Sequence, residues 1–431
     1  MRRARALLAW LILIVVVGCE RDEIVSVDPG AAPGESSPTV ESIVGPTAVN
    51  EWIDTVFSGF VVPASAPFVL AESGTPELMS RGLARFGFIT DTVVLADTIS
   101  AISEFREGRV VLTLDTARST LAASGTTVRL RTVEQAWDLG SVTWELAVDS
   151  LGVSEPWTGG AGGSLGPVLS EVKLSEFPDS IILPLGESSD SLIASWIEDG
   201  RVNSGLALVV ADSGRLVAGS AIRLRYDGVP ELQPDTTVDL AVFSSGSTFI
   251  FDRASAPAES GALRLGGIEG WRSYVEIALP DTIAALGSGQ RFSLRGSTVD
   301  KAELVLISRP APPPPFGADV PFQVQVFQLA DDFQMFGPKT PMGAVVSGSV
   351  TVLQPDSLEV GETIALDITG RVQRFADVPL DSTAPPLRLA VRPEIEATTI
   401  GFWEFGAAGG DPAFTPFLRI VFTPPVEFRL P

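Results

Sequence analysis

Three tryptophans lie in one short segment of the chain, where acidic side chains are interleaved with them. They are Trp137, Trp144 and Trp157. If the rings are exposed, they could form a platform on which sugar rings stack. If they are buried, they would be hydrophobic anchors, which is the usual fate of large aromatic side chains. We therefore consider these tryptophans a candidate carbohydrate-binding site, with a role in the protein core as the alternative.

The sequence contains no histidine and a single cysteine, Cys19. The absence of histidine excludes a Ser-His-Asp triad, a histidine zinc site and histidine as a general base. Two carboxylates could still hydrolyse a glycosidic bond, since 53 acidic residues are present, but no pair stands out by its motif. We therefore expect no enzyme and no cofactor, and a carboxylate-based glycosidase or polysaccharide lyase is the least favoured alternative.

Three other segments resemble ligand-binding motifs incompletely. The glycine-rich run 159–166 lacks the lysine and the helix start of a phosphate-binding loop, which favours a turn between strands. Asp331 and Asp332 lack the spacing of an EF-hand, so a solvated turn is expected and no metal site. The proline-rich run 309–315 predicts a stiff connector, with docking of a partner as the alternative.

The N-terminus has the features of an export signal. A basic start is followed by an apolar run, 6–17, that is too short to span a bilayer comfortably. The run ends in Val16-Val17-Gly18-Cys19, which resembles a bacterial lipobox. This resemblance implies a signal peptide over residues 1–18 and acylation of Cys19, by which the protein is anchored in the lipid bilayer. An ordinary signal peptide with a chance cysteine is the alternative.

The segment behind the cysteine predicts a location and a spacer. Glu20 stands where some enterobacterial lipoproteins carry an aspartate linked to inner-membrane retention, and this favours the outer membrane, at its periplasmic face or the cell surface. Residues 19–46 are rich in Asp, Glu, Ser, Pro and Gly and predict a disordered tether with an end-to-end distance of about 30 Å. The net charge of −23 argues against nucleic acid as a partner.

From about residue 50 onward, apolar and polar residues alternate with a period of two. The runs 128–131, 222–226, 324–326 and 418–420 show this alternation, which is typical of half-buried antiparallel strands. Helical periodicity is scarce. The clearest case is 189–199, where Leu192 and Trp196 share one face and Gly200 follows as a stop. Its counterpart is 369–376, with Val372 and Phe375 pointing inward.

The same order of elements occurs twice along the chain. The blocks 180–210 and 363–391 each read as a strand, a short helix and an apolar strand, and neighbouring strands can be matched in the same order. We therefore predict an all-β protein with two tandem antiparallel β-sandwich domains, jelly-roll-like and each with one short helix. Their expected boundaries are 47–230 and 239–428.

Several segments resemble the DNRLRE domain family. Residues 137–145 (WDLGSVTWE) resemble the W-x-x-x-S-V-T-W segment of that family, and 192–208 resembles its helix–strand stretch. In the second half, 263–267, 272–275 and 366–369 match other parts of the pattern. The two copies cover nearly all of residues 60–428. The resemblance implies an extracellular β-sandwich similar to carbohydrate-binding modules.

Two functional hypotheses follow. The first is a non-catalytic cell-envelope lipoprotein that binds extracellular or envelope polysaccharide. The second is a structural, assembly or adhesion protein of the envelope that docks another protein. Exposed tryptophan rings on one face would favour the first hypothesis, and buried rings would favour the second.

Overall fold

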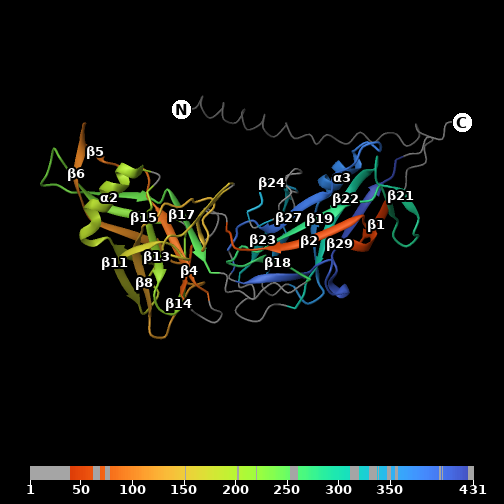
Figure 1. Cartoon of the computed structure of the whole chain (residues 1–431), viewed down its shortest axis with the longest axis horizontal. Helices are drawn as coiled ribbons and strands as arrows, with labels where there is room; N and C mark the ends of the chain where they lie inside the picture. Colours follow the sequence, from red (N-terminus) through yellow and green to blue (C-terminus); the bar gives the residue numbers. More distant parts are fainter. Residues whose placement is uncertain are drawn as a thin grey trace, which may run out of the picture. The chain divides into compact units, whose positions relative to one another are not determined.

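Antiparallel β-sheet makes up most of the regular structure. The computed structural model describes residues 39–61, 68–72, 78–150, 152–200, 203–219, 221–252, 261–310, 320–329, 337, 339–346, 351–354, 358–397, 399 and 401–425. Within these ranges the strands are joined by short turns, and two α-helices are present (Figure 1). The prediction of an all-β fold is confirmed. The expected signal peptide, Cys19, Asp331, Asp332 and residues 311–315 lie outside the described residues.

The first lobe, residues 68–252, consists of two packed sheets. The larger sheet contains β3 (Phe68–Glu72), β4 (Ser80–Arg85), β7 (Thr120–Leu121), β8 (Thr126–Val133), β11 (Leu165–Leu174), β13 (Leu206–Val210), β14 (Gly214–Ala218) and β17 (Gly246–Phe251). Its order is β11-β8-β13-β4-β3-β14-β7, and β17 also pairs with β4. The smaller sheet contains β5 (Thr92–Leu95), β6 (Thr98–Thr113), β12 (Ser180–Pro184), β15 (Arg223–Pro230) and β16 (Val238–Phe243). Its order is β12-β6-β15-β16, with β5 paired to β6.

Alternating apolar residues of the two sheets form the core of the first lobe. Leu130 and Leu208 of the larger sheet belong to one buried cluster with Leu112 and Leu224 of the smaller sheet. The helix α2 (Ser189–Asp199) adds Ile193 and Trp196 to this core. Trp196 is buried as predicted, whereas Leu192, predicted on the same face, is only partly buried and packs against the core. It ends at Gly200, which has a φ of 58°, a conformation that glycine adopts without a steric penalty.

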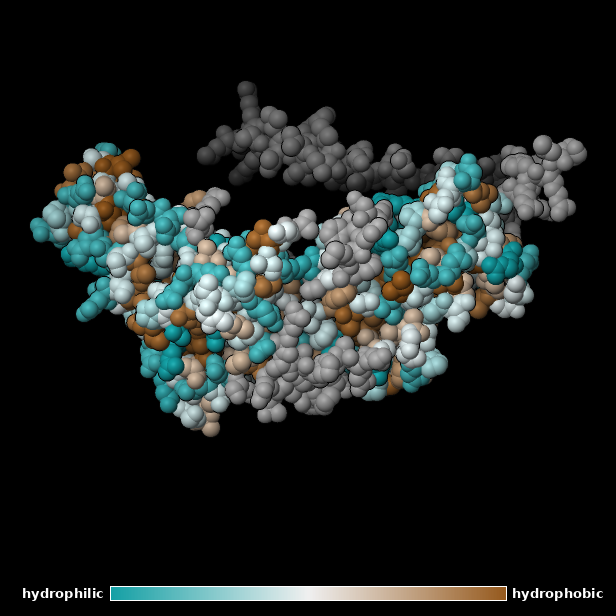
Figure 2. Space-filling view, in the orientation of Figure 1, coloured by the Kyte–Doolittle hydropathy of each residue, from teal (hydrophilic) through white to brown (hydrophobic). Residues whose placement is uncertain are grey.

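Two hairpins extend the first lobe. β9 (Leu146–Ser150) pairs with β10 (Val153–Pro156), and both belong to the tryptophan-rich segment. β5 and the first part of β6 form the other hairpin, in which Val94 and Ile99 are cross-strand partners. Both side chains are exposed, and hydrophobic residues gather at this end of the lobe (Figure 2). A short 3-10 helix, η2 (Gly186–Ser188), precedes α2.

The second lobe consists of residues 40–57 and 261–425. One sheet contains β2 (Glu51–Phe57), β19 (Arg272–Ala278), β23 (Phe322–Leu329), β24 (Met342–Val345), β25 (Thr351–Leu353) and β27 (Leu387–Pro393), in the order β2-β19-β27-β23-β24, with β25 also on β23. The other contains β1 (Val40–Val44), β22 (Thr298–Ile307), β26 (Thr363–Asp367) and β29 (Phe417–Thr423), in the order β1-β29-β22-β26. Smaller elements are β18 (Ala262–Gly266) with β28 (Phe402–Gly406), β20 (Thr282–Ala284) with β21 (Arg291–Ser293), η1 (Pro46–Ala48) and η4 (Pro412–Phe414).

The core of the second lobe is built in the same way as that of the first. Leu304 and Leu418 belong to one buried cluster with Leu389 and Val324 of the facing sheet. The helix α3 (Thr369–Ala376) contributes Val372 and Phe375 to it, as predicted. Both lobes thus combine two antiparallel sheets with one short helix, and Figure 1 shows α2 and α3 beside the strands of their respective lobes.

The two lobes share one plan of strand pairing. In the first lobe, β8, β13, β4 and β17 are successive neighbours, and β12, β6, β15 and β16 form the facing sheet. In the second lobe, β23, β27, β19 and β2 occupy the corresponding places, and β26, β22, β29 and β1 form the facing sheet. The first pair of strands in each repeat is therefore β1–β2 in one copy and β16–β17 in the other.

These first strands are exchanged between the repeats. β1 pairs with β29 and β2 pairs with β19, both in the second lobe, although β1 and β2 precede the first lobe in the sequence. β16 and β17 follow β15 but pair with β15 and β4 in the first lobe. The strand pairing therefore differs from the expected boundaries of 47–230 and 239–428, and residues 40–44 of the expected tether form a strand. An alternating pattern specifies the buried face of a strand, not which sheet edge it joins.

Deletion of residues 39–57 tests the exchange. We expect β19 and β29 of the second lobe to lose protection against amide hydrogen exchange, because their edge N–H and C=O groups lose their partners. β4 and β13 should keep theirs. Deletion of residues 21–38 is the control, since it removes none of the described strands. Loss of protection in β4 instead would show that β1 and β2 belong to the first lobe.

The two tyrosines of the chain predict a loss of stability at alkaline pH. Tyr226 and Tyr274 are 1% and 2% exposed. Burial raises the pKa of Tyr226 from 10.0 to about 12, and burial also raises the pKa of Tyr274. Since the unfolded chain ionises first, stability that is fully present below pH 10 should fall as the pH approaches 12. For Tyr226 the loss is about 3 kcal/mol, at about 1.4 kcal/mol per pKa unit.

Absorbance of tyrosinate measures this effect directly. The folded protein should ionise its tyrosines well above the pH at which the denatured chain does. Tyr226→Phe should remove part of the alkaline loss in the free energy of unfolding, since the variant lacks the ionisable hydroxyl. Ionisation of both tyrosines near pH 10 in the folded protein would contradict the prediction.

Candidate functional site

The tryptophan-rich segment covers the outer face of the larger sheet in the first lobe. Leu83 of β4, Ala207 of β13 and Ile250 of β17 point away from the main core and form a second buried cluster. Trp137, Trp144 and Trp157 belong to this cluster and are 3%, 6% and 4% exposed. The sheet is thus buried on both faces around β4, β13 and β17, where the three tryptophans cover its outer face.

Two of the indole N–H groups have backbone acceptors inside this cover. Trp137 Nε1 donates to the Ser204 carbonyl oxygen at 2.9 Å, and Trp157 Nε1 donates to the Thr143 carbonyl oxygen at 3.0 Å. Buried rings with such partners cannot stack against a sugar. The interpretation of the three tryptophans as a stacking platform is therefore corrected. Their role as hydrophobic anchors follows from the apolar outer face of the sheet, which has to be covered.

Two arginines of β4 stack on these rings. The Arg85 guanidinium carbon lies 4.2 Å from the ring centre of Trp137, and that of Arg81 lies 4.9 Å from Trp144. Both arginines point to the outer face because side chains four residues apart on a strand share a face. Burial lowers the pKa of both guanidinium groups, but arginine stays protonated at physiological pH. The indole rings therefore hold the two guanidinium groups at the edge of the tryptophan-rich segment.

The glycine-rich run forms a turn between β10 and β11, as predicted, and it closes over Arg81. The Gly162 N–H donates to the Trp144 carbonyl oxygen at 2.6 Å, and its own carbonyl oxygen accepts from Arg81 Nη1. Gly162 has a φ of 88°, and a Cβ there would lie 2.5 Å from Arg81 Nη1 and 2.8 Å from the Trp144 ring. Glycine is needed at this position both for its backbone conformation and for the close approach.

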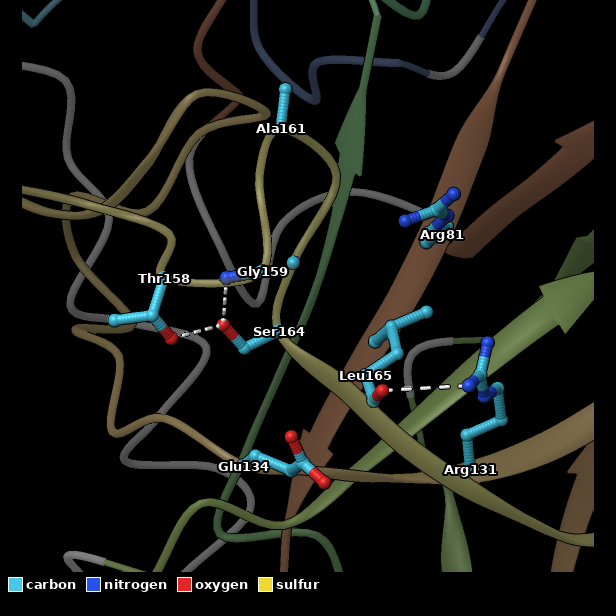
Figure 3. A pocket seen from close by; sticks show the side chains of 9 residues that line it. Arg81, Arg131, Glu134, Thr158, Gly159, Ala161, Ser164 and Leu165 are labelled. Atoms are coloured by element: carbon cyan, nitrogen blue, oxygen red, sulfur yellow. Dashed lines mark hydrogen bonds between the residues drawn. The ribbon is translucent and has the colours of Figure 1, made fainter.

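A polar cavity of about 420 Å³ opens between this turn and the sheet (Figure 3). On the sheet side, Arg131 of β8 donates from Nε to the Gly166 carbonyl oxygen at 2.8 Å. On the turn side, the hydroxyls of Thr158 and Ser164 are 2.7 Å apart. The lining residues are Arg81, Arg131, Glu134, Thr158, Gly159, Ala161, Gly163, Ser164 and Leu165. The cavity therefore offers guanidinium donors on one side and hydroxyl and carboxylate oxygens on the other.

Sequence reasoning missed the residues of this cavity. Arg131 was part of an alternating run that predicts only a half-buried strand, and Glu134 belongs to no motif. The glycine-rich run was correctly interpreted as a turn, but its neighbours across the sheet could not be inferred. The sequence contains one signal that points to this cavity. Arg129 and Arg131 occupy alternate positions, so their charged side chains share one face of β8.

Buried arginines of the second lobe are neutralised by carboxylates. Arg272 Nε lies 2.5 Å from Glu396 Oε1, and the two side chains are 2% and 0% exposed. Arg264 Nη2 lies 2.8 Å from Glu404 Oε1, also buried. Such pairs stabilise a fold only when both partners are present, because an unpaired buried charge is costly. We assign them a structural role, in contrast to the arginines of the cavity.

No helix within the described residues has both the length and the apolar character needed to cross a bilayer. The same residues contain no group of three or more histidine, cysteine or acidic side chains arranged to hold a metal ion. No protein-family model matches the sequence, and a comparison with curated proteins finds no match. The resemblance to DNRLRE domains therefore gains no support from these comparisons, and no functional residue is transferred from it.

Two glycines of the turn provide a matched test of the close packing over Arg81. Gly160 and Gly162 both have positive φ, but a Cβ at Gly160 meets no atom within 4 Å. Gly160→Ala should cost about 1 kcal/mol from backbone strain alone. Gly162→Ala should cost about 1–3 kcal/mol more, since the added methyl group meets Arg81 and Trp144. Denaturant unfolding measures both values. An equal loss in the free energy of unfolding for the two variants would show that the turn does not pack closely against Arg81.

Proposed function

We propose that the chain is an exported, non-catalytic lipoprotein of the bacterial cell envelope, tethered through Cys19 and acting as a structural or assembly protein that docks another envelope protein. The lipobox-like sequence supports the anchor, and Glu20 favours the outer membrane. The observation that carries the proposal is the burial of Trp137, Trp144 and Trp157. Since the rings are used to cover a sheet, the main argument for an aromatic glycan platform is lost.

The exchanged strands also suit a structural role. The second lobe is formed from two separate segments, 40–57 and 261–425, and the first lobe, 68–252, is inserted between them in the sequence. A protein that links a membrane to a partner must bear load without the separation of its parts. The chain passes between the two lobes twice, from β2 to β3 and from β17 to β18, and two connections serve this purpose better than a single linker.

Polysaccharide binding is the second candidate function. The cavity beside the glycine-rich turn supports it, because guanidinium, hydroxyl and carboxylate groups are the partners that sugar units use. This site uses none of the three tryptophans as a stacking surface.

Membrane fractionation and crosslinking in cells test the first proposal. The wild-type protein should fractionate with membranes and incorporate labelled palmitate, whereas Cys19→Ser should lose the label, since the lipid attaches to the sulfur. Crosslinking of the wild-type protein should return one reproducible protein partner.

Two outcomes contradict this proposal separately. Unchanged palmitate labelling in Cys19→Ser would exclude the lipid anchor at this residue. A set of neighbours that changes from one experiment to the next would exclude docking to a defined partner. Trp157→Ala is the control for effects of disturbed folding, since it disturbs the packing of the tryptophans on the sheet but retains Cys19.

A further inference from the structure

Two arginines face the cavity without a carboxylate partner. Arg81 of β4 and Arg131 of β8 lie on strands that flank β13, on the outer face of the sheet. Within the described part of the chain, neither forms an ion pair, whereas Arg129 beside them pairs with Glu171 at 2.9 Å. Glu72 favours the charged form of Arg81, and Arg131 opposes it. An anionic ligand can therefore supply the ion-pair partner that these two neighbouring arginines lack among the described side chains.

Both guanidinium groups are held in place before any ligand arrives. Arg81 stacks on Trp144 and donates to the Gly162 carbonyl oxygen, while Arg131 donates to the carbonyl oxygens of Gly166 and Leu165. A guanidinium has five N–H donors, and these contacts use only some of them. The remaining donors can bind a carboxylate at little further cost in side-chain entropy.

The opposite side of the cavity presents hydroxyl groups and a carboxylate. The Ser164 hydroxyl lies 2.7 Å from that of Thr158 and accepts from the Gly159 N–H at 2.8 Å, so the turn is fixed around it (Figure 3). Glu134 lines the same cavity and can accept hydrogen bonds only. Its negative charge repels a dianion such as phosphate but suits a ligand that bears one carboxylate and several hydroxyls.

We propose that this cavity binds a carboxylate-bearing sugar unit of an acidic polysaccharide. The carboxylate of the sugar is held by Arg81 and Arg131, and its hydroxyls donate to Glu134 and exchange hydrogen bonds with Thr158. The volume of about 420 Å³ is in the range of small-ligand sites and accommodates one or two sugar units. The inference rests on the second candidate function and names its site and ligand class.

Calorimetric titration of the full chain in detergent tests this proposal with three probes. These are an oligosaccharide of galacturonic acid, a neutral oligosaccharide of glucose, and inorganic phosphate. We expect binding of the acidic oligosaccharide alone, weakened by salt as charge recognition requires. Arg131→Gln should weaken this binding about tenfold or more, because a charge-assisted contact to the carboxylate is lost. Arg129→Gln, on the same strand and face, should leave binding unchanged.

The outcomes separate the ligand class from the function. Equal binding of the neutral oligosaccharide would overturn the acidic specificity and leave polysaccharide binding in place. Binding of phosphate alone would overturn the sugar ligand in favour of a simple anion site. Binding of none of the three would overturn both.

A second variant keeps the test decisive if Arg131→Gln fails to fold. Glu134 is exposed, so Glu134→Gln should retain the fold, which a thermal melt verifies. It should weaken binding of the acidic oligosaccharide and allow binding of inorganic phosphate, which the wild-type protein should not bind. If Glu134→Gln changes neither, the hydroxyl-binding side of the cavity is not as proposed.

Discussion

The exchange of first strands between the two repeats is the constraint on which the rest of the fold depends. β1 and β2 complete the second lobe, and β16 and β17 complete the first. A sheet edge exposes a row of N–H and C=O groups that must be paired or protected. The second lobe therefore needs β1 and β2, which precede the first lobe in the sequence, whereas the first lobe is completed by β16 and β17 of its own continuous segment. The two lobes share a plan of strand pairing, but only the second is formed from two separate segments.

The burial of β4, β13 and β17 on both faces of the larger sheet explains why the three tryptophans are buried. An antiparallel sheet commonly leaves one face in water, and its strands then alternate between apolar and polar residues. Here β4 and β13 place Leu83 and Ala207 on the outer face, where water is unfavourable. The tryptophan-rich segment covers them. Arg81 and Arg85, which β4 carries on the same face, stack on the indole rings, and Arg81 also lines the cavity.

Charge is distributed differently in the two lobes. In the second lobe, Arg264 and Arg272 are buried with a carboxylate each, and their ion pairs are closed to ligands. In the first lobe, Arg81 is held by the Trp144 ring and a backbone carbonyl oxygen, and Arg131 is held by backbone carbonyl oxygens. Neutral partners fix a guanidinium without cancelling its charge. The same residue type thus serves as an internal support in one lobe and as a potential recognition group in the other.

The sequence alone was sufficient to predict the all-β class, several of the strands and both helices, but not the strand at 40–44. Alternation in runs such as 128–131, and the spacing of Val372 and Phe375 in α3, are local properties that reflect which face of an element is buried. The tertiary structure decided which edge each strand joins, because the alternation in β1 and β16 indicates a buried face but does not name the partner strand, which is β29 for β1 and β15 for β16. The tertiary structure also buries Trp137, Trp144 and Trp157. It places Arg81 and Arg131 on the two strands that flank β13, so both line one cavity. These relations join residues far apart in the chain, and a local pattern holds no information about such contacts.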